Sequence, residues 1–250
     1  GFGSDTRRSS RRAKFRGFSR ASCCASLSWA RSPRSWEGRN RSAAATVRSH
    51  PDKYRILLIS DEVICSFGRL GHWFGEGLTG VVPDLITFAK GSTSGYAPLG
   101  GMIARSPLVE ALYDSEQGGV FTHGATWGGH PVSTAVAHAN ISAMRDEDVL
   151  GNVRERGPGL KADLEGLMDT HNCVKDVRGT GYFYALELMA DRADARELTR
   201  DQHPKVLRET LPAAFERTGV SLRGDDRGGT MLMVSPPLVA QDGELRHLVQ

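Results

Sequence analysis

The chain has 250 residues, of which 39% are hydrophobic, and its 32 Lys and Arg exceed its 29 Asp and Glu by a formal net charge of +3. This length is enough for one large domain or two small ones. No apolar run approaches the roughly 18–20 residues that a membrane-spanning helix requires, and residues 51–250 offer no basic face for nucleic acid. We therefore expect neither a membrane nor a nucleic acid as a partner.

Residues 1–50 differ from the rest of the chain in charge. They hold eleven Arg, one Lys and eleven Ser but only Asp5 and Glu37, a net charge of +10 that leaves −7 for residues 51–250. They show no helical or strand period, which is typical of low-complexity or disordered sequence. An Arg-rich, acid-poor segment also fits an organellar transit peptide, but it starts at Gly1 and has no amphipathic stripe.

The cysteine and histidine spacings predict no metal site. The four cysteines have neither metal-ligand spacing nor a secretory context, which favours reduced thiols in a cytoplasmic protein. They are Cys23, Cys24, Cys65 and Cys173. His72, His123 and His130 are not paired at i, i+4 and have no cysteines at zinc-finger spacing.

Two short aliphatic runs predict neighbouring strands that end in reactive side chains. Arg55–Ser60 is followed by Asp61, and Leu85–Ala89, after a Gly-rich loop at 67–80, is followed by Lys90. Ligands of open α/β sheets bind outside the carboxyl ends of the strands, so we expect Asp61 and Lys90 to face one crevice. A carboxylate for a pyridinium nitrogen and an amine for a Schiff base are what pyridoxal 5′-phosphate requires.

Further elements follow toward the middle of the chain. Leu99–Ala104 is a third strand-like run, and Ser106–Tyr113 predicts a short helix with Ser106 as its cap and Pro107 at its first position. His130–Met144 predicts a longer helix that also opens with a proline. Its periodicity places four apolar residues on one face, namely Val132, Ala135, Val136 and Ala139.

The last hundred residues alternate helical and strand-like patterns. Beyond Asn152, helical periodicity is interrupted by strand-like runs at Val174–Val177, Tyr182–Leu188 and Met231–Val234, and the sequence ends within a predicted helix at Gly243–Gln250. This order suits a smaller α+β domain.

Four motifs in this order resemble the class III aminotransferases. They are DEVICSFGRLGHWFG at 61–75, PDLITFAKG at 83–91, YAPLGGMIA at 96–104 and FTHGATWGGHP at 121–131. The similarity extends from about residue 52 to residue 250 and is closest to the omega-amino acid:pyruvate transaminases. It implies an α/β fold of the fold type I, pyridoxal-phosphate-dependent class. Residues 51–150 would form the C-terminal part of a large domain with a mainly parallel sheet, and residues 151–250 a small α+β domain.

The resemblance also implies roles for individual residues. Lys90 would form the Schiff base and move a proton on the substrate, and Asp61 would pair with the pyridine nitrogen. Val63, two residues on, would share Asp61's side of the strand and lie against the cofactor ring. Thr126 would bond the cofactor phosphate of the neighbouring subunit, which implies a homodimer with shared sites. Arg223 would bind a substrate carboxylate with its planar fork.

Simpler interpretations of these residues stay open. Arg227 lies close to Arg223 and is an alternative carboxylate ligand, while Arg69 and Arg178 are expected to have structural roles. Taken singly, the five site residues also suit ordinary positions: a surface charge for Lys90 and Arg223, a strand cap or ion pair for Asp61, a core position for Val63 and a loop position for Thr126.

The N-terminal segment departs from the family. Relatives hold the cofactor phosphate with a Gly/Ser-rich turn and stack an aromatic residue on the ring, both upstream of Asp61, and neither occurs in residues 1–50. We therefore expect the N-terminal part to be missing or replaced, for example by sequence translated out of frame.

The predicted function is transfer of an amino group from an omega-amino acid or amine to a keto acid such as pyruvate. Alternatives are another class III enzyme, such as an ornithine-type aminotransferase or an aminomutase, and an inactive truncated fragment. A protein that binds nucleic acid or membrane through residues 1–50 is disfavoured, because that segment lacks the aromatic and Gly interleaving of RNA-binding tails.

Overall fold

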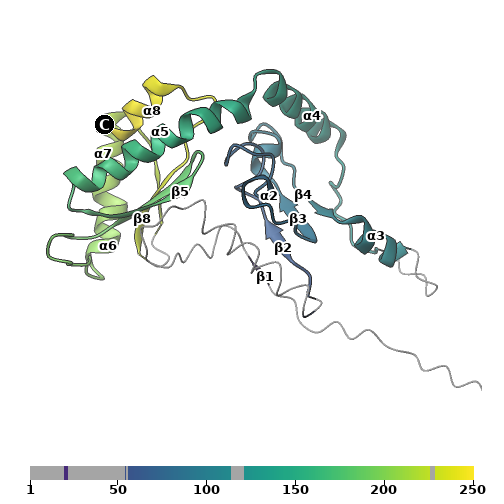
Figure 1. Cartoon of the computed structure of the whole chain (residues 1–250), viewed down its shortest axis with the longest axis horizontal. Coiled ribbons are helices and arrows are strands. Elements are labelled where there is room, and N and C mark those ends of the chain that lie inside the picture. The colour runs from purple at the N-terminus through teal and green to yellow at the C-terminus, as the bar shows by residue number, and fades with distance from the viewer. Residues whose placement is uncertain (1–19, 22–53, 55, 114–120, 226–228) are drawn as a thin grey trace, which may run out of the picture.

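The computed structural model describes residues 20–21, 54, 56–113, 121–225 and 229–250. Within these ranges the strands form two sheets, with orders β1-β2-β3-β4 and β5-β6-β8-β7 (Figure 1). Of the first fifty residues the structure describes only Arg20–Ala21, so the prediction of disorder for residues 1–50 falls almost entirely outside the described residues.

The first sheet is parallel except at one edge. β2 (Ile59–Asp61) lies between β1 (Arg20–Ala21) and β3 (Leu85–Phe88) and is parallel to both, whereas β4 (Gly101–Ala104) is antiparallel to β3. β2 begins later than predicted. At Leu58 the backbone N–H donates to Oδ2 of Asp84 at 2.8 Å, so a side chain takes the place of a strand partner there.

The connection from β2 to β3 contains the short helix α2 (Glu76–Thr79), where the sequence predicted only a Gly-rich loop. Phe67 is buried at the centre of this connection, and its ring packs edge-on against three other aromatic rings at centroid distances of 5.7–6.4 Å. These are Trp73, Phe74 and Phe88. Edge-to-face packing of this kind adds to the free energy of burial.

The two predicted helices of the middle region are confirmed as α3 (Ser106–Tyr113) and α4 (Pro131–Asp146). The four apolar residues that periodicity grouped on one face of α4 are not the ones it buries: Val132 is 63% exposed, and the buried residues of the helix are Ser133, Ala137 and Met144. The buried face follows from the tertiary neighbours of α4, because Met144 joins the Phe67 cluster and Asn140 binds a polar turn.

The second sheet is antiparallel throughout. It consists of β5 (Val174–Thr180), β6 (Phe183–Leu188), β8 (Thr230–Val234) and β7 (Arg223–Asp225). The three predicted strands are confirmed, whereas β7 was not predicted. Arg178 has the expected structural role, since it donates to Oε2 of Glu187 on β6 at 2.6 Å.

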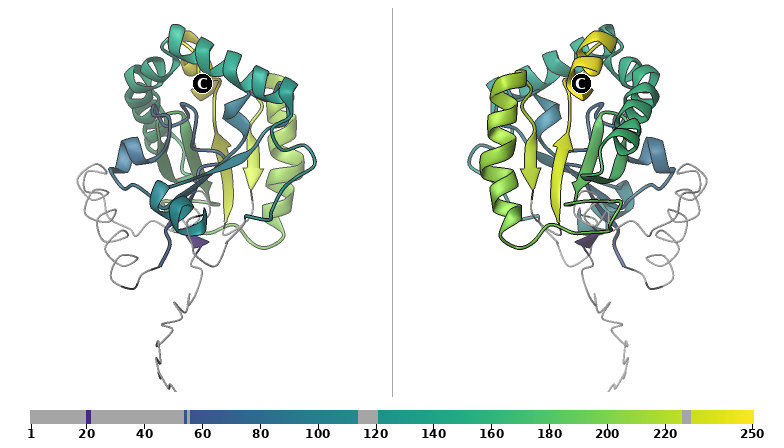
Figure 2. Two further views of the ribbon diagram at one scale, coloured as in Figure 1. Left: turned by 90° about the vertical axis from the view of Figure 1, so that its right-hand side faces the viewer. Right: turned by 90° about the vertical axis from the view of Figure 1, so that its left-hand side faces the viewer.

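Helices enclose this sheet. α5 (Val149–Thr170) and α8 (Asp242–Val249) share the main core with β6 and β8, while α6 (Gln202–Lys205), η2 (Val206–Thr210) and α7 (Leu211–Thr218) form one helical segment. Both views of Figure 2 show the strands between this yellow-green segment and the green α5. Within the described ranges, no helix combines the length and the apolar character needed to cross a membrane.

Arg69 ties the β2–β3 connection to the second sheet. Its guanidinium donates to the carbonyl oxygens of Tyr182 at 3.2 Å and Pro236 at 2.6 Å, and its own carbonyl accepts from the backbone N–H of Tyr182 at 3.0 Å. Both partner residues are buried, and burial lowers the pKa of Arg69. The guanidinium therefore satisfies carbonyl groups that have little access to water.

We expect Arg69→Met to lower the free energy of unfolding by roughly 1.5–3 kcal/mol, because two buried carbonyls lose a charged donor while the length of the side chain is largely kept. Chemical denaturation monitored by circular dichroism measures this loss. The control Arg217→Met, on exposed α7, should change stability by no more than about 0.5 kcal/mol. Equal stability of the two variants would contradict the role of Arg69.

Candidate active site

Parallel pairing of β2 and β3 brings a carboxylate and an amine to one edge of the first sheet. Asp61, the last residue of β2, is in register with Thr87 of β3, and the Thr87 hydroxyl donates to Oδ1 of Asp61 at 3.3 Å. Lys90 follows three residues after Thr87 and is exposed. The structure thus places Asp61 and Lys90 at the ends of adjacent strands on the same edge, and the crevice that they were expected to share stays a prediction.

The chain turns immediately after Asp61. The backbone N–H of Val63 donates to Oδ1 of Asp61 at 3.2 Å, a side-chain-to-backbone bond typical of turns. β2 ends at Asp61, so the alternation of strand side chains that was used to place Val63 does not apply, and that argument is wrong. Val63 is partly buried, and its contact with a cofactor ring stays a prediction.

Lys90 begins a strained turn. The 3₁₀ segment Lys90–Ser92 (η1) starts with Lys90 at φ 45°, and Ser94 lies at φ 50°. Left-handed backbone costs a non-glycine residue on the order of 1–3 kcal/mol and persists where the surroundings hold it in place. Ser92 and Thr93, which belong to this turn, are buried. The Thr93 hydroxyl donates to the carbonyl of Ala97 at 2.6 Å.

Asn140 of α4 is a residue of this region that the sequence analysis missed. Its side-chain amide donates to the carbonyl oxygens of Gly91 and Ser92, directly after Lys90. An amide among the small and apolar residues of the helix was the available signal, but helical periodicity drew attention only to the apolar residues.

Glu62 follows Asp61 directly and is 2% exposed. Both of its carboxylate oxygens accept from the backbone N–H of Gly75 at 3.0 Å, and Oε1 also accepts from the Ser60 hydroxyl at 3.0 Å. Burial is the largest influence on this group and raises the pKa of Glu62, although the hydrogen bond from Gly75 opposes it. Glu62 therefore holds the β2–β3 connection together.

The residues at this edge fit the reactive half of pyridoxal phosphate. The cofactor needs an acceptor for its protonated ring nitrogen and a primary amine for its aldehyde, and Asp61 is a carboxylate and Lys90 a primary amine at the ends of adjacent strands. Thr126, the predicted phosphate ligand, lies in a fully exposed loop at 121–129 and makes no hydrogen bond within the described residues. Of the groups predicted to bind the cofactor, Asp61, Val63 and Lys90 therefore lie near this edge of the first sheet, whereas Thr126 belongs to a separate loop.

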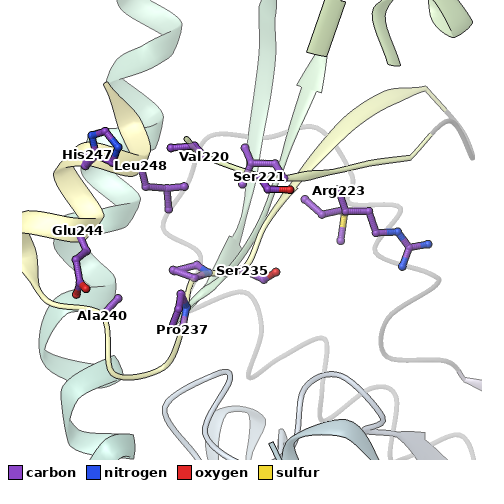
Figure 3. Close-up of a pocket in the computed structure, with 12 residues that line it drawn as sticks. Val220, Ser221, Arg223, Ser235, Pro237, Ala240, Glu244, His247 and Leu248 are labelled. Atoms are coloured by element: carbon purple, nitrogen blue, oxygen red, sulfur yellow. The ribbon is translucent and has the colours of Figure 1, made fainter. Parts of the chain in front are cut away.

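Arg223 belongs to the second sheet and is also separate from the Asp61–Lys90 pair. It is the first residue of β7, its side chain is 69% exposed, and it lies 3.7 Å from the Asp225 carboxylate. It lines a cavity of about 300 Å³ whose other wall includes Glu244 and His247 of α8. In Figure 3 the guanidinium points away from both of these residues. Arg227, the alternative ligand, lies outside the described residues.

The family model for class III aminotransferases matches residues 39–250. The chain therefore belongs to the class III aminotransferases, as its motifs predicted. The match begins within residues 1–50, whereas the motifs predicted the likeness only from about residue 52.

Two curated relatives are similar to this chain. A probable aminotransferase of Mycobacterium tuberculosis is 46% identical over 198 residues, which make up 79% of this chain and 42% of the relative. The putrescine–pyruvate aminotransferase of Pseudomonas aeruginosa is 41% identical over 198 residues, which make up 79% of this chain and 41% of the relative. The chain thus spans about two fifths of the length of these proteins.

Solved structures show the same fold. An (S)-enantioselective omega-transaminase from Thermomicrobium roseum has a TM-score of 0.75 at 35% identity, covering 84% of this chain and 45% of that one. An amine transaminase from an uncultivated Pseudomonas species, in its PLP-bound form, also scores 0.75, at 32% identity, covering 84% of this chain and 46% of that one. The predicted α/β fold of the fold type I transaminases is therefore confirmed for this part of the molecule.

Glu62 generates a prediction about pH. Because its folded-state pKa is raised above its ordinary value of 4.5, its contribution to stability is fully present below that value and is lost as the pH rises through the folded-state pKa. We expect Glu62→Gln, which cannot ionise, to lose less stability than the wild type between pH 4.5 and neutrality.

Denaturant titrations across this pH range measure the difference. The control Glu216→Gln, at an exposed position of α7, should follow the wild-type profile. A Glu62→Gln profile that is parallel to the wild type would show that Glu62 ionises in the folded protein as readily as in the unfolded one.

Proposed function

We propose that this chain contributes the lysine and the ring-nitrogen carboxylate to a pyridoxal-phosphate-dependent transaminase. The enzyme would move an amino group from an omega-amino acid or amine to a keto acid such as pyruvate. The observation that carries the proposal is the placement of Asp61 and Lys90 at the carboxyl ends of paired parallel strands. The names of the Pseudomonas aeruginosa relative and of the Thermomicrobium roseum structure support the choice of substrates.

The chemistry would be divided between the cofactor and the chain. Pyridoxal phosphate, when bound, supplies a ring that takes up the electrons of the deprotonated substrate carbon. Asp61 would keep the ring nitrogen protonated, and the Thr87 hydroxyl, which donates to Oδ1, would help to orient the carboxylate. Lys90 would hold the cofactor through its amine and then move the proton at the substrate carbon.

Three further assignments complete the proposal. Val63 would lie against the ring, Thr126 would bind the phosphate of a neighbouring subunit, and Arg223 would bind a substrate carboxylate. The exposure of Thr126 and of the Arg223 side chain suits groups that meet a partner subunit or a ligand. The functional unit would be a cytoplasmic homodimer, with residues 51–150 in the large domain and residues 151–250 in the small one.

We expect pyridoxal phosphate to attach covalently to Lys90. The purified chain is incubated with the cofactor and reduced with borohydride, and the modified peptides are identified by mass spectrometry. Lys90→Ala should lose the label, whereas Lys161→Ala, in α5, should keep it. Folded protein with no label on Lys90 would contradict the assignment.

Asp61→Asn should keep the label, because the lysine amine is unchanged. It should slow amino transfer by on the order of 10²-fold or more, because the amide cannot stabilise a protonated ring nitrogen. Activity is measured with a panel of amines, omega-amino acids and 2-amino acids against pyruvate, and the preferred donor separates an omega-transaminase from an ornithine-type enzyme. A wild-type chain that is labelled but transfers no amino group from any donor would identify an inactive fragment.

A further inference from the structure

The turn from Lys90 to Ser94 is hydrogen-bonded to α4 through the side-chain amide of Asn140. Nδ2 of Asn140 donates to the carbonyl oxygen of Gly91 at 2.9 Å and to that of Ser92 at 3.1 Å. Its Oδ1 accepts from the hydroxyl of Ser94 at 2.7 Å. Asn140 thus bonds three of the four residues that follow Lys90, all except Thr93, from an element more than forty residues away in sequence.

The turn needs such support because its own hydrogen bonds are long. The backbone N–H groups of Ser92, Thr93 and Ser94 donate to the carbonyls three residues earlier at 3.2, 3.2 and 3.4 Å. Lys90 and Ser94, at the two ends, both have positive φ. Weak local bonds do not offset the strain of two left-handed residues, so the conformation depends on contacts from outside the turn.

Only an amide group satisfies all three bonds. The turn presents two acceptors and one donor to the same side chain, and asparagine offers two N–H donors and a carbonyl acceptor at one fixed reach. A carboxylate at position 140 could accept from Ser94 but would face two carbonyl oxygens without a donor. Leucine, which is similar in size, could make none of these bonds.

We propose that Asn140 is a positioning residue for Lys90: by holding the carbonyls of Gly91 and Ser92, it fixes the backbone from which the lysine amine approaches the cofactor. This inference rests on the proposed function, because it assigns Asn140 to the site that Lys90 defines. The catalytic contact itself belongs to Lys90.

The chain contains a matched control for this arrangement. Asn152 donates through Nδ2 to the carbonyl oxygens of Leu238 at 2.8 Å and Ala240 at 3.1 Å, and its Oδ1 accepts from Nε2 of Gln241 at 3.0 Å. The same three kinds of bond are made, but to a loop that does not contain Lys90. Replacing Asn152 therefore removes an equal set of bonds without touching the lysine turn.

The experiment compares Asn140→Leu, Asn140→Asp and Asn152→Leu with the wild type as full chains. Three quantities are measured: thermal stability, amide hydrogen exchange at residues 92–94, and the rate at which pyridoxal phosphate with borohydride labels Lys90. All three variants should lose stability. Both Asn140 variants should exchange roughly ten-fold faster at 92–94, as the loss of one to two hydrogen bonds implies, and should label Lys90 about ten-fold more slowly.

Asn152→Leu should keep the wild-type exchange at 92–94 and the wild-type labelling rate. The proposal is overturned if the Asn140 variants label Lys90 at the wild-type rate, or if Asn152→Leu slows labelling as much as they do. If the wild type itself takes no label, the proposed function fails, and exchange at 92–94 then decides separately whether Asn140 holds the turn.

Discussion

The parallel pairing of β2 with β3 is the constraint on which the candidate site depends. Parallel neighbours must be joined by a crossover that returns the chain to the starting edge, and their carboxyl ends then lie together. Asp61 and Thr87 form the last residue pair of the two strands, so both strands reach the edge of the sheet at this level. Lys90 consequently emerges beside the Asp61 strand, although 28 residues of sequence separate the two positions.

The crossover is held by polar contacts as much as by apolar packing. Glu62 binds Gly75 with both carboxylate oxygens, Asp84 binds Leu58, and the buried Phe67 ring packs against the ring of Phe88. Burying a carboxylate is costly unless its oxygens are bonded, and here the bonds fix the path of the connection. Arg69, also in the β2–β3 connection, joins it to the second sheet through hydrogen bonds to the carbonyl oxygens of Tyr182 and Pro236.

In the turn from Lys90 to Ser94, the exposed lysine and the buried residues that stabilise the turn are different residues. Lys90 is exposed and strained, whereas Ser92 and Thr93, two and three residues after it, are buried. β3 and α4, on either side of the turn, hold it in place and so offset the free-energy cost of the left-handed backbone conformation of Lys90. Similarity to transaminases of which the matched part covers about two fifths places this arrangement within the class III aminotransferases.

The sequence by itself determined most of the helices and strands, although not α2 or β7, and the chemical pair Asp61 and Lys90, because periodicity, capping residues and strand-end side chains are local properties. Only the tertiary structure decided that α4 buries Ser133 and Ala137 rather than Val132, that the strand ends before Val63, and that Asn140 binds the lysine turn. These outcomes depend on contacts between residues far apart in the chain. The free energy gained by burying or hydrogen-bonding a side chain depends on where its contacting residues lie, which local sequence preferences do not specify.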